Sequence, residues 1–146
     1  TPLPVGDTLI KAQRVVGTET LHKLIQHSLV LVPTAQKVSQ VSGEVTDVVT
    51  DVIAGKVIVQ GVFTARISFT GADGINYETE ERLSFVGYVV LAGAQPGMTA
   101  KVIPGVIGII PEFDVSENLL HIKVLLKLTV KALQWVQAAV AEYSTL

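Results

Sequence analysis

The three histidines are the first residues to test for metal binding or acid–base chemistry. His22 and His27 stand five positions apart near the beginning of the chain, and His121 lies far downstream. Paired zinc ligands on one helix face are usually three or four residues apart, and the sequence contains no HExxH motif. We therefore expect surface histidines, with no metal ion or other cofactor bound.

The carboxylates do not form a catalytic pair either. Asp47 and Asp51 fall in a segment with strand-like alternation, where four residues span about 13 Å. This separation is too large for a carboxylate dyad or a shared ion. A second set of acidic residues lies in a predicted turn and on the strand that follows it: Asp73, Glu78, Glu80 and Glu81. It could attract Ca²⁺ or a basic partner weakly, but a solvated outer strand face is the favoured interpretation.

Motifs for covalent catalysis and phosphate binding are missing. The chain has no cysteine, and none of its serines lies in a Gly-x-Ser-x-Gly elbow. There is no P-loop or GxGxxG motif, and the glycines at 105 and 108 lie between two prolines, where they suit turn geometry. We expect a protein that is not an enzyme.

Composition indicates burial against other protein. The 146 residues are 49% hydrophobic and 16% charged, and the mean hydropathy is +0.50. Soluble domains usually contain about 25% charged residues. The net charge of −2 argues against a nucleic-acid surface. No apolar run is long enough for a membrane span, and residues 1–4 do not resemble the start of a signal peptide.

The elements that would position any site are strands. In residues 53–85, every second residue from 57 to 69 is apolar or glycine, which predicts one buried strand face. The sequence Gly71-Ala72-Asp73-Gly74 predicts a turn, after which residues 75–85 run back with a polar face. We interpret this segment as a long β-hairpin.

Further strands complete the predicted all-β fold. Residues 29–32 form a short strand that Pro33 ends, and residues 38–53 alternate with a possible bulge at Ser42-Gly43. Pro96-Gly97 suggests a type II turn, and Pro104-Gly105 interrupts the alternation of residues 98–110. In residues 119–133, the apolar residues at 120, 122, 124, 126, 128 and 130 share one face, and the other face carries a stripe of lysines at 123, 127 and 131. We expect a β-sandwich of long antiparallel strands.

Two terminal segments flank the predicted sandwich. We expect an N-terminal arm over residues 1–28, a domain over 29–136 and a tail over 137–146. In the arm, residues 9–10 and 15–16 are possible strand pieces, and a helix capped by Thr20 is possible from the spacing of Leu21, Leu24 and Ile25. The tail could be a short helix or an extended arm. The candidate assembly residues are the apolar and aromatic residues of these ends: Leu9, Ile10, Val15, Val16, Leu21, Leu24, Ile25, Trp135 and Tyr143.

The order of four segments resembles the SPOCS domain family of spore-forming bacteria. The segments are LVLVP at residues 29–33, VIAGKVIVQG at 52–61, SF at 84–85 followed by VLAGA at 90–94, and NLLHIKV at 118–124. The resemblance implies a β-rich, non-catalytic domain that is used in protein assembly at the spore envelope. It places the protein on the spore surface or coat, or in an extracellular appendage.

Three functions are consistent with these observations. The first is a structural protein that self-assembles into a filament, tubule or envelope layer, because an apolar arm can add a strand to the edge of a neighbouring sheet. The second is a spore-coat module that recruits a different protein. The third is a carbohydrate-binding sandwich, which would need exposed aromatic residues in a row. We expect a homopolymer as the main partner state, with other spore-envelope proteins as possible partners.

Overall fold

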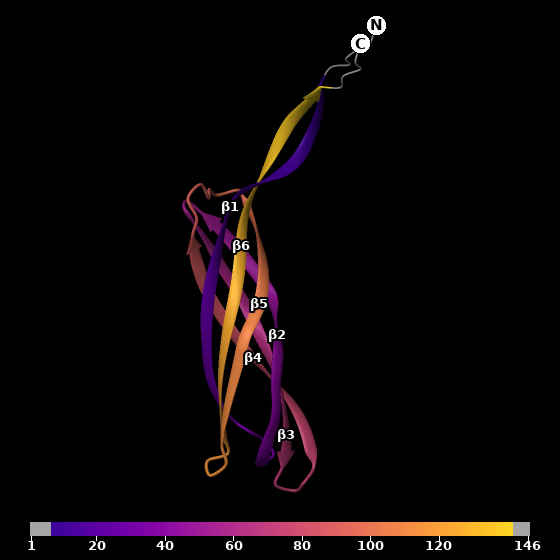
Figure 1. The fold of residues 1–146 in the computed structure, drawn as a ribbon, viewed down its shortest axis with the longest axis vertical. Coiled ribbons are helices and arrows are strands. Elements are labelled where there is room, and N and C mark those ends of the chain that lie inside the picture. The colour runs from indigo at the N-terminus through magenta and orange to yellow at the C-terminus, as the bar shows by residue number, and fades with distance from the viewer. Residues whose placement is uncertain (1–6, 142–146) are drawn as a thin grey trace.

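Six long antiparallel strands form the protein, and they pack as two sheets of three strands (Figure 1). The computed structural model describes residues 7–141, with side chains for residues 12–136. One sheet has the order β1-β6-β5 and the other has the order β2-β3-β4. The strands are β1 (Asp7–Val30), β2 (Ala35–Ile53), β3 (Lys56–Gly71), β4 (Asn76–Val90), β5 (Thr99–Asp114) and β6 (Leu119–Ala141). The predicted all-β sandwich is confirmed.

The predicted hairpin is β3 and β4, which pair without a register shift from Lys56–Val90 to Thr70–Asn76. The turn between them contains Gly74 at a φ of 81°, a conformation that glycine adopts without steric cost. The whole predicted inner face of β3 is buried: Val57, Val59, Gly61, Phe63, Ala65, Ile67 and Phe69. Strict alternation in the sequence therefore corresponds to a sheet with one core face and one solvent face.

The core lies between the two central strands, β3 and β6. In β6, the predicted inner residues are all buried: Leu120, Ile122, Val124, Leu126, Leu128 and Val130. Leu83, Phe85 and Val89 of β4 add to the same core from the edge. No polar or charged residue is buried among the described residues, so dispersion and the hydrophobic effect hold the sheets together.

The helix expected after Thr20 is wrong, because residues 7–30 form the single strand β1. Leu21 and Ile25 point into the core, and Leu24 is exposed on the outer face of the sheet. Apolar residues four apart share a face in a strand as well as in a helix, so the spacing did not distinguish the two. Pairing with the apolar strand β6 decides for the strand. Residues 29–32 are the end of β1 and the start of the following loop, and the predicted boundary at residues 28–29 falls inside this strand.

Two local predictions about β2 and β5 are also corrected. The register of β2 against β3 shifts at Ala35/Lys37, Val38/Gln40 and Thr46/Val49, and there is no shift at Ser42-Gly43. A Cβ at Gly43 would lie 2.5 Å from Cζ of Phe63, so this glycine makes room for a core ring. Pro104-Gly105 does not interrupt β5, because β5 is an edge strand where proline is tolerated.

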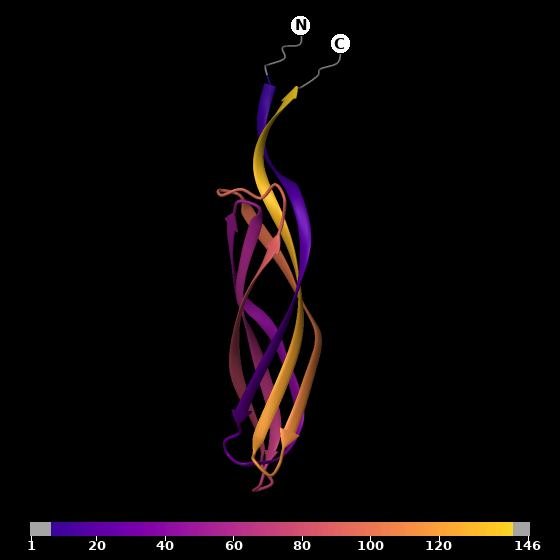
Figure 2. The same cartoon turned by 90° about the vertical axis from the view of Figure 1, so that its left-hand side faces the viewer.

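Beyond the sandwich, β1 and β6 continue alone as a two-stranded ribbon (Figures 1 and 2). The pairing of β5 with β6 ends at Thr99–Leu133, whereas β1 and β6 stay paired to Asp7–Ala141. We call residues 7–15 and 134–141 the terminal ribbon. The predicted tail is thus extended up to Ala141, as a strand.

At the other end of the long axis, three connections meet (Figures 1 and 2). We call them the turn end: the β1–β2 loop at residues 31–34, the β3–β4 turn at 72–75 and the β5–β6 turn at 115–118. Their backbones are joined, since the Ala72 N–H donates to the Thr34 carbonyl at 2.9 Å. The molecule is therefore an elongated sandwich with a ribbon at one end and a turn end at the other.

Candidate functional site

Two of the three histidines contact side chains on neighbouring strands. Nε2 of His27 lies 3.1 Å from Oε1 of Glu81, joining β1 to β4 across one open side of the sandwich. On the outer face of the β1-β6-β5 sheet, the hydroxyl of Ser28 lies 2.6 Å from Nδ1 of His121. Within residues 7–141, no group of three His, Asp or Glu side chains is placed to hold a metal ion.

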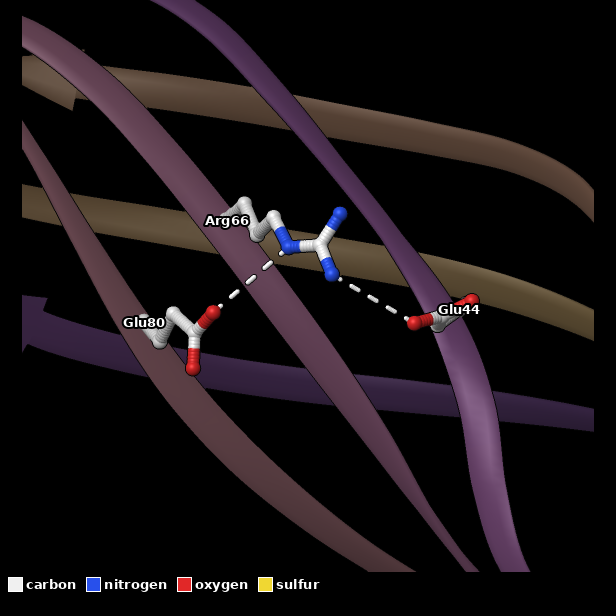
Figure 3. Close-up of polar contacts among 3 residues, drawn as sticks. All are labelled: Glu44, Arg66 and Glu80. Carbon is white, nitrogen blue, oxygen red and sulfur yellow. Dashed lines mark hydrogen bonds and ion pairs between the residues drawn. The ribbon is translucent and has the colours of Figure 1, made fainter.

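Acidic side chains on the outer face of the β2-β3-β4 sheet are paired with arginines. Arg66 lies between two carboxylates, with Nη2 3.4 Å from Glu44 and Nε 3.5 Å from Glu80 (Figure 3). Nη2 of Arg82 donates to Asp47 at 2.9 Å. All of these side chains are about half exposed or more, so each pair contributes at most about 1 kcal/mol. The interpretation as a solvated strand face agrees with this geometry, except that Glu81 faces His27.

One hollow lies on the same outer face, with a volume of about 340 Å³. The side chains of Asp47, Val49, Gln60, Val62 and Val86 contribute to its lining. It is open to solvent and brings together no nucleophile and base. The exposed aromatic residues Tyr88 and Trp135 lie on different sheets, so among residues 12–136 there is no aromatic row of the kind expected for carbohydrate binding.

Some candidate assembly residues do lie on or near the terminal ribbon. Val15 and Trp135 have 51% and 57% of their surface exposed. Leu9 and Ile10 belong to the ribbon by their backbone, opposite Ala139 and Ala138. Tyr143 is outside the described residues.

Other candidate assembly residues belong to the sandwich itself. Ile25 is buried and Leu21 packs against the core, close to Gly87. Val16 packs on the core from the bulge of β1, between Val15 and Gly17. Leu24 is half exposed in the middle of the outer face, opposite Leu125. Among the candidates whose side chains the structure describes, Val15, Leu24 and Trp135 are the exposed ones.

The turn end carries a surface that the sequence reasoning missed. Four aliphatic side chains are exposed there: Val30 at 59%, Val32 at 81%, Ile75 at 56% and Val115 at 62%. Turns normally hold polar residues, glycine and proline. The signal available in the sequence was a β-branched residue inside or beside each of these connections, but the sequence did not show that the three connections meet.

Comparison with known proteins identifies the family. The family model described as SipL, SPOCS domain, matches residues 34–114, which is more than half of the chain. The chain belongs to the SPOCS domain family. The SPOCS domain family is a family of spore-associated proteins from spore-forming bacteria. The match covers β2 to β5, whereas the terminal ribbon is built from β1 and β6, outside it.

No curated protein and no solved structure matches the chain. A search of the described residues finds no helix of the length and apolar character that a membrane crossing needs.

Proposed function

We propose that this SPOCS protein is a non-catalytic structural subunit of the spore surface, coat or an appendage, and that it assembles with copies of itself through the terminal ribbon. The single observation that carries the proposal is the projection of the ribbon beyond both sheets (Figures 1 and 2). No cofactor is needed for this function.

The ribbon has unused capacity for strand pairing. Beyond Leu133, β6 has no β5 neighbour, so among residues 7–141 no strand pairs with one edge of residues 134–141. A two-stranded hairpin is marginally stable in water unless a third strand or a packing surface supports it. Strand addition satisfies free N–H and C=O groups and buries the ribbon faces at the same time.

The ribbon is also more apolar than a free surface element needs to be. Residues 132–141 read ALQWVQAAVA and contain no charge, and residues 8–18 contain only Lys11 and Arg14. With Val15 and Trp135 exposed at its base, the ribbon offers apolar surface that the chain's own sandwich does not cover. Contact with another copy would remove that surface from water.

The test compares the full chain with a variant that lacks residues 1–15 and 135–146. The variant keeps the strand pairs on which the sandwich depends, so circular dichroism should still show a folded β protein. Light scattering after size-exclusion chromatography, with negative-stain microscopy, should show polymers for the full chain and monomers for the variant. Polymers from the variant, or a full chain that stays monomeric as concentration rises, would contradict self-assembly through the ribbon. Recovery of the full chain as a defined complex with a different spore protein would favour a recruiting module instead.

A further inference from the structure

We propose that the turn end is the acceptor for the terminal ribbon of a second copy, so that subunits join head to tail. This inference rests on the proposed self-assembly and adds the surface that receives the ribbon. The acceptor consists of four exposed aliphatic residues, Val30, Val32, Ile75 and Val115. It also includes the carboxylates of Asp73, Asp114 and Glu117.

The turn end has an apolar surface. Val32, Ile75 and Val115 come from three different connections, yet each leaves more than half of its surface exposed at the same end of the molecule (Figure 1). A single exposed valine is ordinary, but several gathered at one tip are typical of an interaction surface. An apolar ribbon is a suitable occupant for this surface.

The turn end and the terminal ribbon differ in charge. The three connections contain Asp73 and Glu117 and no basic residue, and Asp114 ends β5 beside them. The ribbon contains Lys11 and Arg14 against one acidic residue, Asp7. Opposite charges on the two ends favour the head-to-tail orientation and disfavour contacts between like ends.

Side-chain hydrogen bonds hold the connections of the turn end in place. Asn118 bridges two connections: its Nδ2 donates to the Leu31 carbonyl at 2.6 Å, and its Oδ1 accepts from the Ala35 N–H at 2.9 Å. The hydroxyl of Ser116 donates to Asp114 at 2.6 Å, which lowers the pKa of that carboxyl, and the Tyr77 hydroxyl does the same for Asp73. Rigid acceptor groups reduce the entropy lost on binding.

The arrangement of the two ends determines the kind of assembly. The ribbon and the turn end lie at opposite ends of the long axis (Figures 1 and 2). A contact between two different surfaces of identical subunits propagates unless a rotation closes it into a ring. Head-to-tail contact along the long axis therefore predicts a filament whose repeat follows the length of the subunit.

The experiment uses full-length variants in polymerisation assays. The acceptor variant carries Val32→Glu and Val115→Glu, and the control carries Val86→Glu, an exposed valine on the outer face of β4 at 52% exposure. We expect the acceptor variant to need at least about tenfold more protein to polymerise, because two apolar contacts are lost. The control should polymerise like wild type, and all variants should keep wild-type stability in urea.

Complementation then identifies which surfaces meet. The ribbon-truncated variant has an intact turn end, and the acceptor variant has an intact ribbon, so the two should form a 1:1 heterodimer and nothing longer. An acceptor variant that polymerises like wild type, while ribbon truncation blocks assembly, overturns the turn end as acceptor and leaves self-assembly in place. Polymerisation blocked by Val86→Glu, with the acceptor variant unaffected, moves the acceptor to the outer face of the β2-β3-β4 sheet. Polymers from the truncated variant defeat the proposed function itself.

Discussion

Asn118 offers a prediction whose size can be worked out from the structure. Its side chain makes two hydrogen bonds, to the Leu31 carbonyl and from the Ala35 N–H, and its backbone has a φ of 53°. Leu31 and Ala35 are 1% and 2% exposed, so their backbone groups have little access to water once the amide is removed. Each lost hydrogen bond costs about 1 kcal/mol, and the left-handed backbone, which asparagine tolerates better than alanine does, costs alanine about 1 kcal/mol more. Asn118→Ala should therefore destabilise the protein by about 3 kcal/mol.

A second substitution separates these contributions. Asn118→Gly loses the same two hydrogen bonds but adopts the positive φ freely, so it should cost about 1 kcal/mol less than Asn118→Ala. The assay is urea denaturation followed by circular dichroism, at protein concentrations below polymerisation, with the slope of the transition compared between variants. If Asn118→Ala lies within about 0.5 kcal/mol of wild type, or Asn118→Gly is equally damaging, the reasoning about this bridge is wrong.

Three further predictions address the core, pH and assembly. Gly61→Ala would place Cβ 2.6 Å from the Phe85 ring and should lower the free energy of unfolding by about 1–3 kcal/mol in urea denaturation. Gly105→Ala should be neutral or slightly stabilising, because the nearest neighbouring atom is 3.7 Å from the added Cβ. Equal effects of the two substitutions would contradict this packing. Because the folded pKa of Asp114 lies below its ordinary value of 3.8, its contribution to stability is present above pH 3.8 and lost as pH falls through the lowered pKa. The stability gap between wild type and Asp114→Asn should thus close in denaturation curves measured below that pH, and a gap that stays constant would refute the assignment. Trp135 is the single tryptophan, so its fluorescence maximum should move to shorter wavelength as the protein polymerises, and no shift would show that it stays in water.

Alternation of apolar and polar residues with a period of two identified the strands that have one buried face and one solvent-exposed face. Phe63 and Phe69 on β3, and Leu126 and Leu128 on β6, were placed in the core from spacing alone, and all four are buried. The same reasoning failed in β1, where Leu21, Leu24 and Ile25 fit a helix as well as a strand. The partner that decides between them, β6, is about a hundred residues away in the chain, and local propensity does not contain that information.

The candidate interfaces were predictable in kind but not in place. The apolar character of both ends of the chain was evident, but only the register of β1 against β6 shows that residues 7–15 and 134–141 leave the sandwich together. That same register places Leu21 and Ile25 inside the subunit, where they are unavailable to a partner. Exposure depends on which strand covers which, so it cannot be read from residue type.

By itself, the sequence determined the strand character and the inner face of the central hairpin and of β6, because these depend on side-chain type and on a period of two. Only the tertiary structure decided that three turns meet at one end and that the ribbon projects from the other. Those facts depend on antiparallel pairing between segments far apart in the chain, which fixes where each connection lies along the long axis. Four ordinary aliphatic residues thereby become a surface that a second copy can recognise.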